Sequence, residues 1–148
     1  MEIQTRKANK EDLQSILDLV NGLALYEKMP ESVTATILDY QAAFADGLIS
    51  AHVAEDNNEI VGMALYYDTF STWRGKMLYL EDFYVKEEYR SKGVGQLLFD
   101  EYISEAKHRN CNLVKWEVLD WNLKAVKFYE KNGATVEKCW WDCKIIFE

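Results

Sequence analysis

The segment at residues 89–96, YRSKGVGQ, contains the residues whose types and spacing most directly suggest chemistry. Gly93 and Gly95 lack side chains, so the backbone there can approach a ligand closely. A loop that opens a helix also presents N–H groups without intrahelical acceptors, which favour an anion such as phosphate. The segment lacks the third glycine of the dinucleotide-binding fingerprint and the Gly-Lys-Ser/Thr ending of a P-loop. It therefore indicates either an anion-binding loop or a tight turn that only joins two elements.

Two adjacent carboxylates, Glu81 and Asp82, lie shortly before this loop. In a regular strand neighbouring side chains point to opposite faces, so both can reach one site only through a bulge. Otherwise one carboxylate is solvated and the other bonds a neighbouring backbone group. The pattern leaves both arrangements open.

The apolar pattern predicts the elements that must position these residues. Asn9 suits the N-cap of a first helix, and apolar residues at helical spacing follow it. Strands are expected at residues 2–8, 49–55, 59–70, 76–85, 112–119 and 139–148, and helices at residues 13–24, 37–48, 94–108 and 122–133. This order predicts an α/β fold in which helices cover a mixed sheet, with a strand-loop-helix unit at its middle.

Composition narrows the class of protein. The 148 residues suit a single domain, residues 1–148, with a sizeable core. The net charge of -8 argues against a nucleic-acid binder, whose surface needs to be basic. No run approaches the roughly 20 apolar residues of a membrane helix, and the N-terminus lacks the apolar core of a signal peptide. We therefore expect a cytoplasmic protein that binds no membrane. The cysteines Cys111, Cys139 and Cys143 lack metal-ligand spacing, so we expect reduced thiols and no metal site.

Four segments together resemble one family. The pattern Arg90-x-x-Gly93-x-Gly95, preceded by YLEDFYV, resembles the pyrophosphate-binding signature of the GNAT N-acetyltransferase superfamily. WNLKAVKFYEKNGA resembles a second conserved segment of that superfamily, and LALYEKM and ALYYDTFSTWRGKMLYLEDFYV are most similar to the spermidine/spermine (diamine) acetyltransferases. The resemblance implies a GNAT fold, with a mixed and mostly antiparallel central sheet that splays at the cofactor site between flanking helices. It also implies acetyl transfer from acetyl-CoA to a primary amine.

The resemblance assigns the binding of acetyl-CoA to three regions. The backbone amides of the loop would hold the pyrophosphate, and Arg90 could add charge or be a surface residue at the helix end. The strand before the loop would pair with the pantetheine arm like an added strand, and the N–H near Val85 would stabilise the oxyanion of a tetrahedral intermediate. The implied cofactor-binding residues are Phe83, Tyr84, Val85, Arg90, Ser91, Lys92, Gly93, Val94, Gly95, Gln96, Asn122, Ala125 and Asn132.

The resemblance also implies the reactive groups. An alkylamine has a pKa of about 10.4, so it arrives protonated and must lose a proton before it attacks. Glu81, first, and Asp82, second, are the candidates to bind or deprotonate it, in a strand that is bulged in this family. Tyr129 would be the general acid for the departing thiolate. The pKa of a thiol is about 8.5, which lies below the pKa of about 10 of a phenol. Tyr129 could instead be an ordinary core tyrosine.

Further substrate contacts follow from the same resemblance. Tyr26 and Glu27 match a helix end that faces the polyamine. Trp73 and Trp116 could form walls of an amine pocket, or could belong to the core.

Two alternatives to this function remain open at this stage. The acceptor could be an aminoglycoside or a protein N-terminus, or the protein could bind CoA without catalysis. Family members commonly form homodimers, and the aromatic segment at residues 139–148 could supply the dimer surface.

Overall fold

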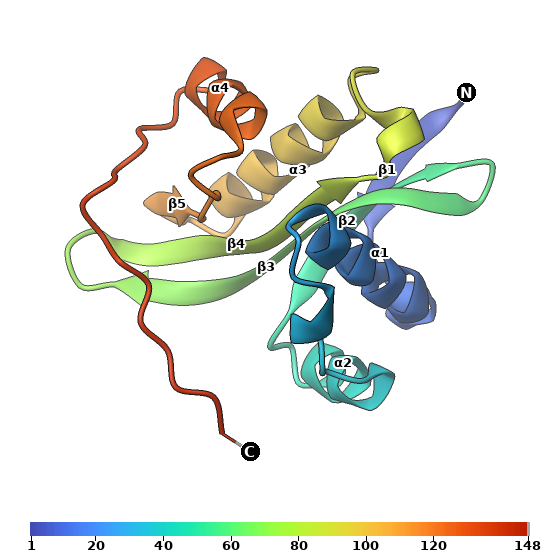
Figure 1. The fold of residues 1–148 in the computed structure, drawn as a ribbon, viewed down its shortest axis with the longest axis horizontal. Helices are drawn as coiled ribbons and strands as arrows, with labels where there is room; N and C mark the ends of the chain where they lie inside the picture. Colours follow the sequence, from blue (N-terminus) through green and yellow to red (C-terminus); the bar gives the residue numbers. More distant parts are fainter. Residues whose placement is uncertain (148) are drawn as a thin grey trace. The chain divides into compact units, whose positions relative to one another are not determined.

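The computed structural model describes residues 1–147. Its contacts divide the chain into two compact units, Met1–Trp116 and a second unit that starts at Glu117. The first unit contains a five-stranded sheet in the order β1-β2-β3-β4-β5 (Figure 1). Its strands are β1 Ile3–Lys7, β2 Ser50–Asp56, β3 Glu59–Ser71, β4 Gly75–Val85 and β5 Leu113–Lys115. The first four strands pair antiparallel, and β5 pairs parallel with β4. The sheet is therefore mixed and mostly antiparallel, as expected. The expectation of a single domain stays a prediction.

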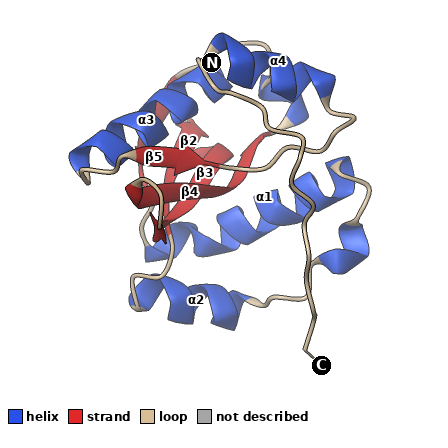
Figure 2. Cartoon of the chain, turned by 90° about the vertical axis from the view of Figure 1, so that its left-hand side faces the viewer, coloured by secondary structure: helices blue, strands red, loops and turns tan. Residues whose placement is uncertain are grey.

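Helices cover both faces of this sheet (Figure 2). Helices α1 (Leu13–Tyr26) and α2 (Ile37–Ala45) lie on one side, and α3 (Val94–His108) lies on the other. Capping boxes mark the starts of helices α1 and α2. Asn9 and Asp12 form the one before α1, and Thr36 and Asp39 form the one at the start of α2. The predicted N-cap at Asn9 is confirmed, although it caps the short 3₁₀ turn Lys10–Asp12 that leads into α1.

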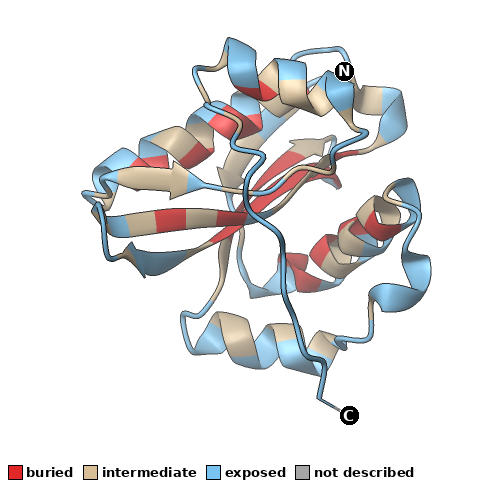
Figure 3. Cartoon of the chain, turned by 60° about the vertical axis from the view of Figure 1, so that its left-hand side comes forward, coloured by how far each residue is buried: buried red, intermediate tan, exposed pale blue. Residues whose placement is uncertain are grey.

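Among the described residues, a hydrophobic cluster lies on each face of the sheet, and we call these the α1 cluster and the α3 cluster. Figure 3 marks the buried residues in red. On the first face, Leu13 and Ile16 of α1 pack with Met63 of β3. On the second face, Val94 and Leu98 of α3 pack with strand residues. Both α3 residues are at most 1% exposed, and burial of one such side chain contributes about 1.5–3 kcal/mol. This packing fixes where α3 begins, and so where the glycine loop ends.

Strand β4 is irregular in two places near Glu81 and Asp82. In the pairing with β3, Leu65 is opposite Asp82 whereas Tyr66 is opposite Leu80, so Glu81 is an extra residue in β4. This confirms the bulge. In the pairing with β5, the register ends where Tyr79 faces Lys115, although β4 continues to Val85. The second half of β4 therefore has β3 on one side and no β5 partner on the other.

The second unit contains α4 (Leu123–Lys131). Asn122 caps it through a hydrogen bond from the N–H of Ala125, and Gly133 follows it with a left-handed φ of 91°. In residues 134–147 the described chain forms neither helix nor strand. The strand predicted at residues 139–148 is therefore wrong for the described part of that range, because an apolar β-rich pattern becomes a strand only with a partner for its backbone.

The strand predicted at residues 112–119 is correct only for Leu113–Lys115, since its pairing with β4 stops there. Among the helices of residues 1–147, none combines the length and the apolar character that a membrane crossing needs.

Candidate active site

The bulge directs Glu81 and Asp82 toward the side of the sheet that carries α1 and α2. Strand alternation places Tyr67 on the same face as Leu65, which belongs to the α1 cluster. The Tyr67 hydroxyl donates a hydrogen bond to Oε1 of Glu81 at 3.0 Å, and its ring stacks on Tyr79 at 5.4 Å. Glu81 itself is exposed. The exposed carboxylate of Glu81 is therefore oriented by an aromatic pair from β3 and β4.

Asp82 is half-buried and titrates differently from an ordinary carboxyl. Burial, as the largest cause, together with the charges of Glu81 and Glu27, raises its pKa to about 7. Burial also raises the pKa of Glu27, at the end of α1. The pKa of Tyr40, on α2, rises to about 12 through burial and the charges of Asp82 and Glu81. Residues from α1, α2 and β4 thus share one electrostatic environment.

Sequence reasoning missed Tyr40, Tyr67 and Tyr79. Tyr67 and Tyr79 were assigned only to strands, and their register in the β3–β4 pair brings them opposite each other. The signal at Tyr40 was a phenol at a position where the helix packs on the α1 cluster. Three tyrosines beside two carboxylates form a surface that suits a cation.

The glycine loop has a left-handed backbone at two positions. Ser91 has φ 61° and Gly93 has φ 85°, and Gly93 is the N-cap of α3 without a side-chain cap. A Cβ added at Gly93 would meet no atom within 4 Å, so space is open above the loop. The N–H groups of the first helical turn lack intrahelical acceptors by geometry. The loop therefore fits a phosphate group at the start of α3.

Two of the residues expected in this loop have additional contacts. The backbone N–H of Arg90 donates to the carbonyl of Glu87 at 3.1 Å, so this amide is already engaged. The side chain of Lys92 is exposed, and its Nζ donates to the carbonyl of Glu88 at 2.9 Å. The expected anion contacts of this loop stay a prediction.

The side chain of Arg90 turns toward β4 and α1. Its Nε donates to the carbonyl of Val85 at 2.8 Å. Its guanidinium lies 4.8 Å from the ring centroid of Tyr26 and 5.1 Å from that of Tyr84. These contacts join the start of the loop to the end of the first helix.

The second half of β4 presents its backbone beside the loop. The side chain of Phe83 packs edge-on against Phe99 of α3 at 6.1 Å, and Val85 is buried in the α3 cluster. Tyr84 lies on the other face, against α1, where a Cβ on Gly22 would approach its hydroxyl to 3.1 Å. Packing on both faces thus fixes this segment, whose register with β5 has already ended at Tyr79.

Residues of the second unit have clear local roles. Tyr129 is the buried residue of α4, and its ring packs edge-on against Phe128 at 5.7 Å. The side chain of Asn132 donates to the carbonyl of Phe128 at 2.9 Å. Asn122 and Ala125 form the helix cap. These contacts hold α4 together, and the roles of all four residues toward acetyl-CoA stay predictions.

The structure does not bring the two tryptophans to the carboxylates. Trp73 lies in the turn between β3 and β4 and is 83% exposed. Trp116 packs edge-on against Phe99 and Tyr102 of α3, at 5.4 and 6.3 Å. Trp116 therefore belongs to the α3 face, whereas Glu81 and Asp82 face α1 and α2.

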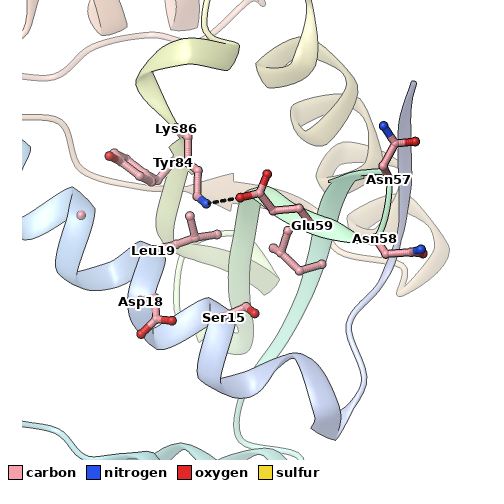
Figure 4. A pocket seen from close by; sticks show the side chains of 10 residues that line it. Ser15, Asp18, Leu19, Asn57, Asn58, Glu59, Tyr84 and Lys86 are labelled. Atoms are coloured by element: carbon pink, nitrogen blue, oxygen red, sulfur yellow. Dashed lines mark hydrogen bonds and ion pairs between the residues drawn. The ribbon is translucent and has the colours of Figure 1, made fainter. Parts of the chain in front are cut away.

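A groove of about 540 Å³ opens beside α1 (Figure 4). An ion pair between Lys86 and Glu59, at 3.2 Å, crosses its edge. The lining residues are Ser15, Asp18, Leu19, Gly22, Asn57, Asn58, Glu59, Ile60, Tyr84 and Lys86. Of the residues expected to act on cofactor or substrate, the groove shares only Tyr84.

Comparisons with known proteins agree with this geometry. The model of the acetyltransferase (GNAT) family matches residues 13–134. A thialysine N-epsilon-acetyltransferase of Bos taurus is 34% identical, over 95% of this chain and 90% of its own length. The human spermidine/spermine N(1)-acetyltransferase-like protein 1 is also 34% identical, over 88% of this chain but 20% of that longer protein.

Among solved structures, an aminoglycoside acetyltransferase from an uncultured soil metagenomic sample superposes with a TM-score of 0.83. It covers 99% of this chain and 97% of its own, and at 16% identity this likeness concerns the fold alone. The match over residues 13–134 shows that this chain, with its glycine loop and bulged β4, belongs to the acetyltransferase (GNAT) family.

Proposed function

We propose that this protein transfers the acetyl group of acetyl-CoA to a primary amine of a small polyamine, diamine or lysine-like substrate such as thialysine. The observation that carries the acceptor class is the group of carboxylates at the bulge. Glu81, Asp82 and Glu27 share one electrostatic environment with Tyr40. Arg90, at the start of the loop, contacts Tyr26, the residue before Glu27. Negative charge with aromatic rings is the surface chemistry that recognises an alkylammonium.

The two carboxylates suit different tasks. Burial raises the pKa of Asp82 to about 7, so near neutral pH it can exchange a proton with the amine. Glu81 is exposed and is oriented by Tyr67, which suits it to bind the ammonium group. This assignment reverses the order expected from the sequence, in which Glu81 was the first candidate for deprotonation.

The cofactor side follows the family. Acetyl-CoA would supply the activated acetyl group, held through its pyrophosphate by the backbone N–H groups of residues 91–96. The open space above Gly93 and the end of the β4–β5 register at Tyr79 support this arrangement. The N–H near Val85 would polarise the thioester carbonyl. Tyr129 would donate a proton to the leaving thiolate.

The test is a thiol-release assay with acetyl-CoA and a panel of amines. Spermidine, putrescine, lysine and thialysine represent the proposed class, and sisomicin and a peptide with a free N-terminus represent the alternatives. An amine whose nitrogen is already acetylated is the matched control. Turnover on the first group and none on the control supports the proposal. Turnover confined to sisomicin or the peptide, or CoA binding without any turnover, refutes it.

Two further properties belong to this proposal. We expect a homodimer, because Trp141 and Phe147 are 91% and 92% exposed in an apolar C-terminal segment, and such patches usually mark interfaces. Light scattering of the full chain, compared with a Trp141→Ser variant, tests this. We also propose a cytoplasmic location, because the three cysteines are free thiols, which fits a reducing compartment. Cell fractionation tests that location.

A further inference from the structure

Arg90 is the first residue of the cofactor loop, yet its side chain contacts other elements. One contact is the hydrogen bond from Nε to the carbonyl of Val85, at the end of β4. The other two are the ring faces of Tyr84 on β4 and Tyr26 at the end of α1, at 5.1 and 4.8 Å. A planar guanidinium suits such a position, because it can stack on rings while its edge donates a hydrogen bond.

These contacts connect the two halves of the proposed site. Tyr26 is followed by Glu27, whose charge acts on the pKa of Asp82. Tyr84 and Val85 belong to the β4 segment proposed to pair with acetyl-CoA. The start of the cofactor loop and the end of the helix beside the carboxylates are therefore held by one side chain.

The same geometry argues against a simple phosphate contact. An arginine that binds a phosphate at this loop would direct its guanidinium toward the phosphate, which would lie beside the N–H groups after Gly93, at the start of α3. Instead, Nε of Arg90 donates its hydrogen bond to the carbonyl of Val85 in β4, and the guanidinium lies over two tyrosine rings.

We propose that Arg90 is a positioning residue that couples the acetyl-CoA loop to the amine site through Tyr26 and Tyr84. Ordering of the loop by acetyl-CoA holds the end of α1 in place for the amine, and binding of the amine orders the loop. Such coupling is reciprocal by thermodynamic necessity, so each ligand strengthens the binding of the other by the same factor. This inference rests on the proposed function, because it needs both ligands.

The experiment compares the wild type with Arg90→Ala, Arg90→Lys, Tyr26→Ala and Tyr26→Phe, using the panel amine of highest turnover. Lys107→Ala, which removes an exposed cation at the end of α3, is the matched control. Steady-state assays give KM for the amine and for acetyl-CoA separately. Calorimetry gives the affinity for the amine with and without saturating CoA.

We expect the wild type to bind the amine more tightly when CoA is present. Arg90→Ala and Tyr26→Ala should each raise both KM values, by roughly threefold to tenfold, as for the loss of a cation–π contact. A double variant that combines Arg90→Ala with Tyr26→Ala should be no worse than Arg90→Ala alone, because both changes break the same connection. Tyr26→Phe keeps the ring and should keep the coupling. Arg90→Lys should not restore it, because an ammonium lacks the planar fork.

Several results would overturn the coupling. One is that Arg90→Ala raises only KM for acetyl-CoA and that Arg90→Lys restores this KM, because a residue that contacts phosphate would behave in this way. Another is equal affinity of the wild type for the amine with and without CoA. If Arg90→Ala does not fold, Tyr26→Ala still decides, because it lies outside the loop and must raise KM for acetyl-CoA. Absence of turnover with every panel amine would instead refute the proposed function itself.

Discussion

Replacement of Asp82 by Asn tests the acid–base reasoning most directly. In the wild type, kcat/KM should rise with pH through about 7, as this carboxyl loses its proton and becomes able to accept one from the amine. Asp82→Asn should remove that limb and lower kcat/KM by roughly a hundredfold or more, the range of a general base. Because Glu81 and Glu27 act on the same carboxyl, the limb reports the group of carboxylates as a whole.

The same substitution has a calculable effect on stability. The folded state holds the Asp82 proton up to about pH 7, whereas the ordinary pKa is 3.8. In that window the folded state binds more protons than the unfolded chain, so stability falls as pH rises and the loss is complete above the folded pKa. The shift of about three units corresponds to at most about 4 kcal/mol at 1.36 kcal/mol per unit. From about pH 5 to about pH 8.5 the loss is at most about 3 kcal/mol.

Thermal unfolding at these two pH values measures the effect. Asp82→Asn should be more stable than the wild type at the higher pH and closer to it at the lower one, although it is less active. Asp46→Asn, a matched change at an exposed aspartate after α2, should keep the wild-type pH dependence. If Asp82→Asn keeps the rising limb of kcat/KM, or loses stability with pH as the wild type does, then Asp82 is not the buried acceptor of the proton.

Three further substitutions test other parts of the site. Tyr129→Phe should lower kcat by roughly a hundredfold while CoA affinity by calorimetry stays near the wild-type value, and an unchanged rate would remove the acid role. Gly93→Ala should raise KM for acetyl-CoA, because a φ of 85° costs a residue with a Cβ about 1–2 kcal/mol. Gly47→Ala, at a φ of 72°, is the control and should leave that KM unchanged. Equal effects of the two substitutions on KM would show that the loop is only a turn. Leu98→Ala, at a fully buried position, should lower the free energy of unfolding by about 2–5 kcal/mol in urea titrations, and a loss below about 1 kcal/mol would place Leu98 outside the core.

Local patterns predicted the elements whose residues are neighbours in sequence. Apolar spacing and Asn9 located the first helix, and the glycine loop before Val94 located the start of α3, because caps and periodicity act over a few residues. Strand alternation showed only that Glu81 and Asp82 could share one site through a bulge, and the bulge itself was implied by the family resemblance. The strand at residues 139–148 was wrong in the described part of that range, because pairing depends on a partner that the segment itself does not encode.

The candidate site was predictable as a set of motifs but not as an arrangement. The sequence placed Glu81, Asp82 and the loop near one another, because they belong to one strand-loop-helix unit. It did not distinguish the tasks of the two carboxylates, since that difference comes from burial. Tyr40 was missed, because its electrostatic interaction with Asp82 joins two elements that are distant in sequence.

The sequence by itself predicted the family, a mixed sheet and the residues that open α3, since these depend on motifs and on short-range periodicity. The mostly antiparallel pairing was implied by the family resemblance. Tertiary structure alone decided three things: that Glu81 is the bulged residue, that Asp82 titrates near neutral pH, and that Arg90 lies between Tyr26 and Tyr84. The physical reason is the same in each case. Strand register, desolvation and ring contacts are set by groups that meet only when distant segments pack together.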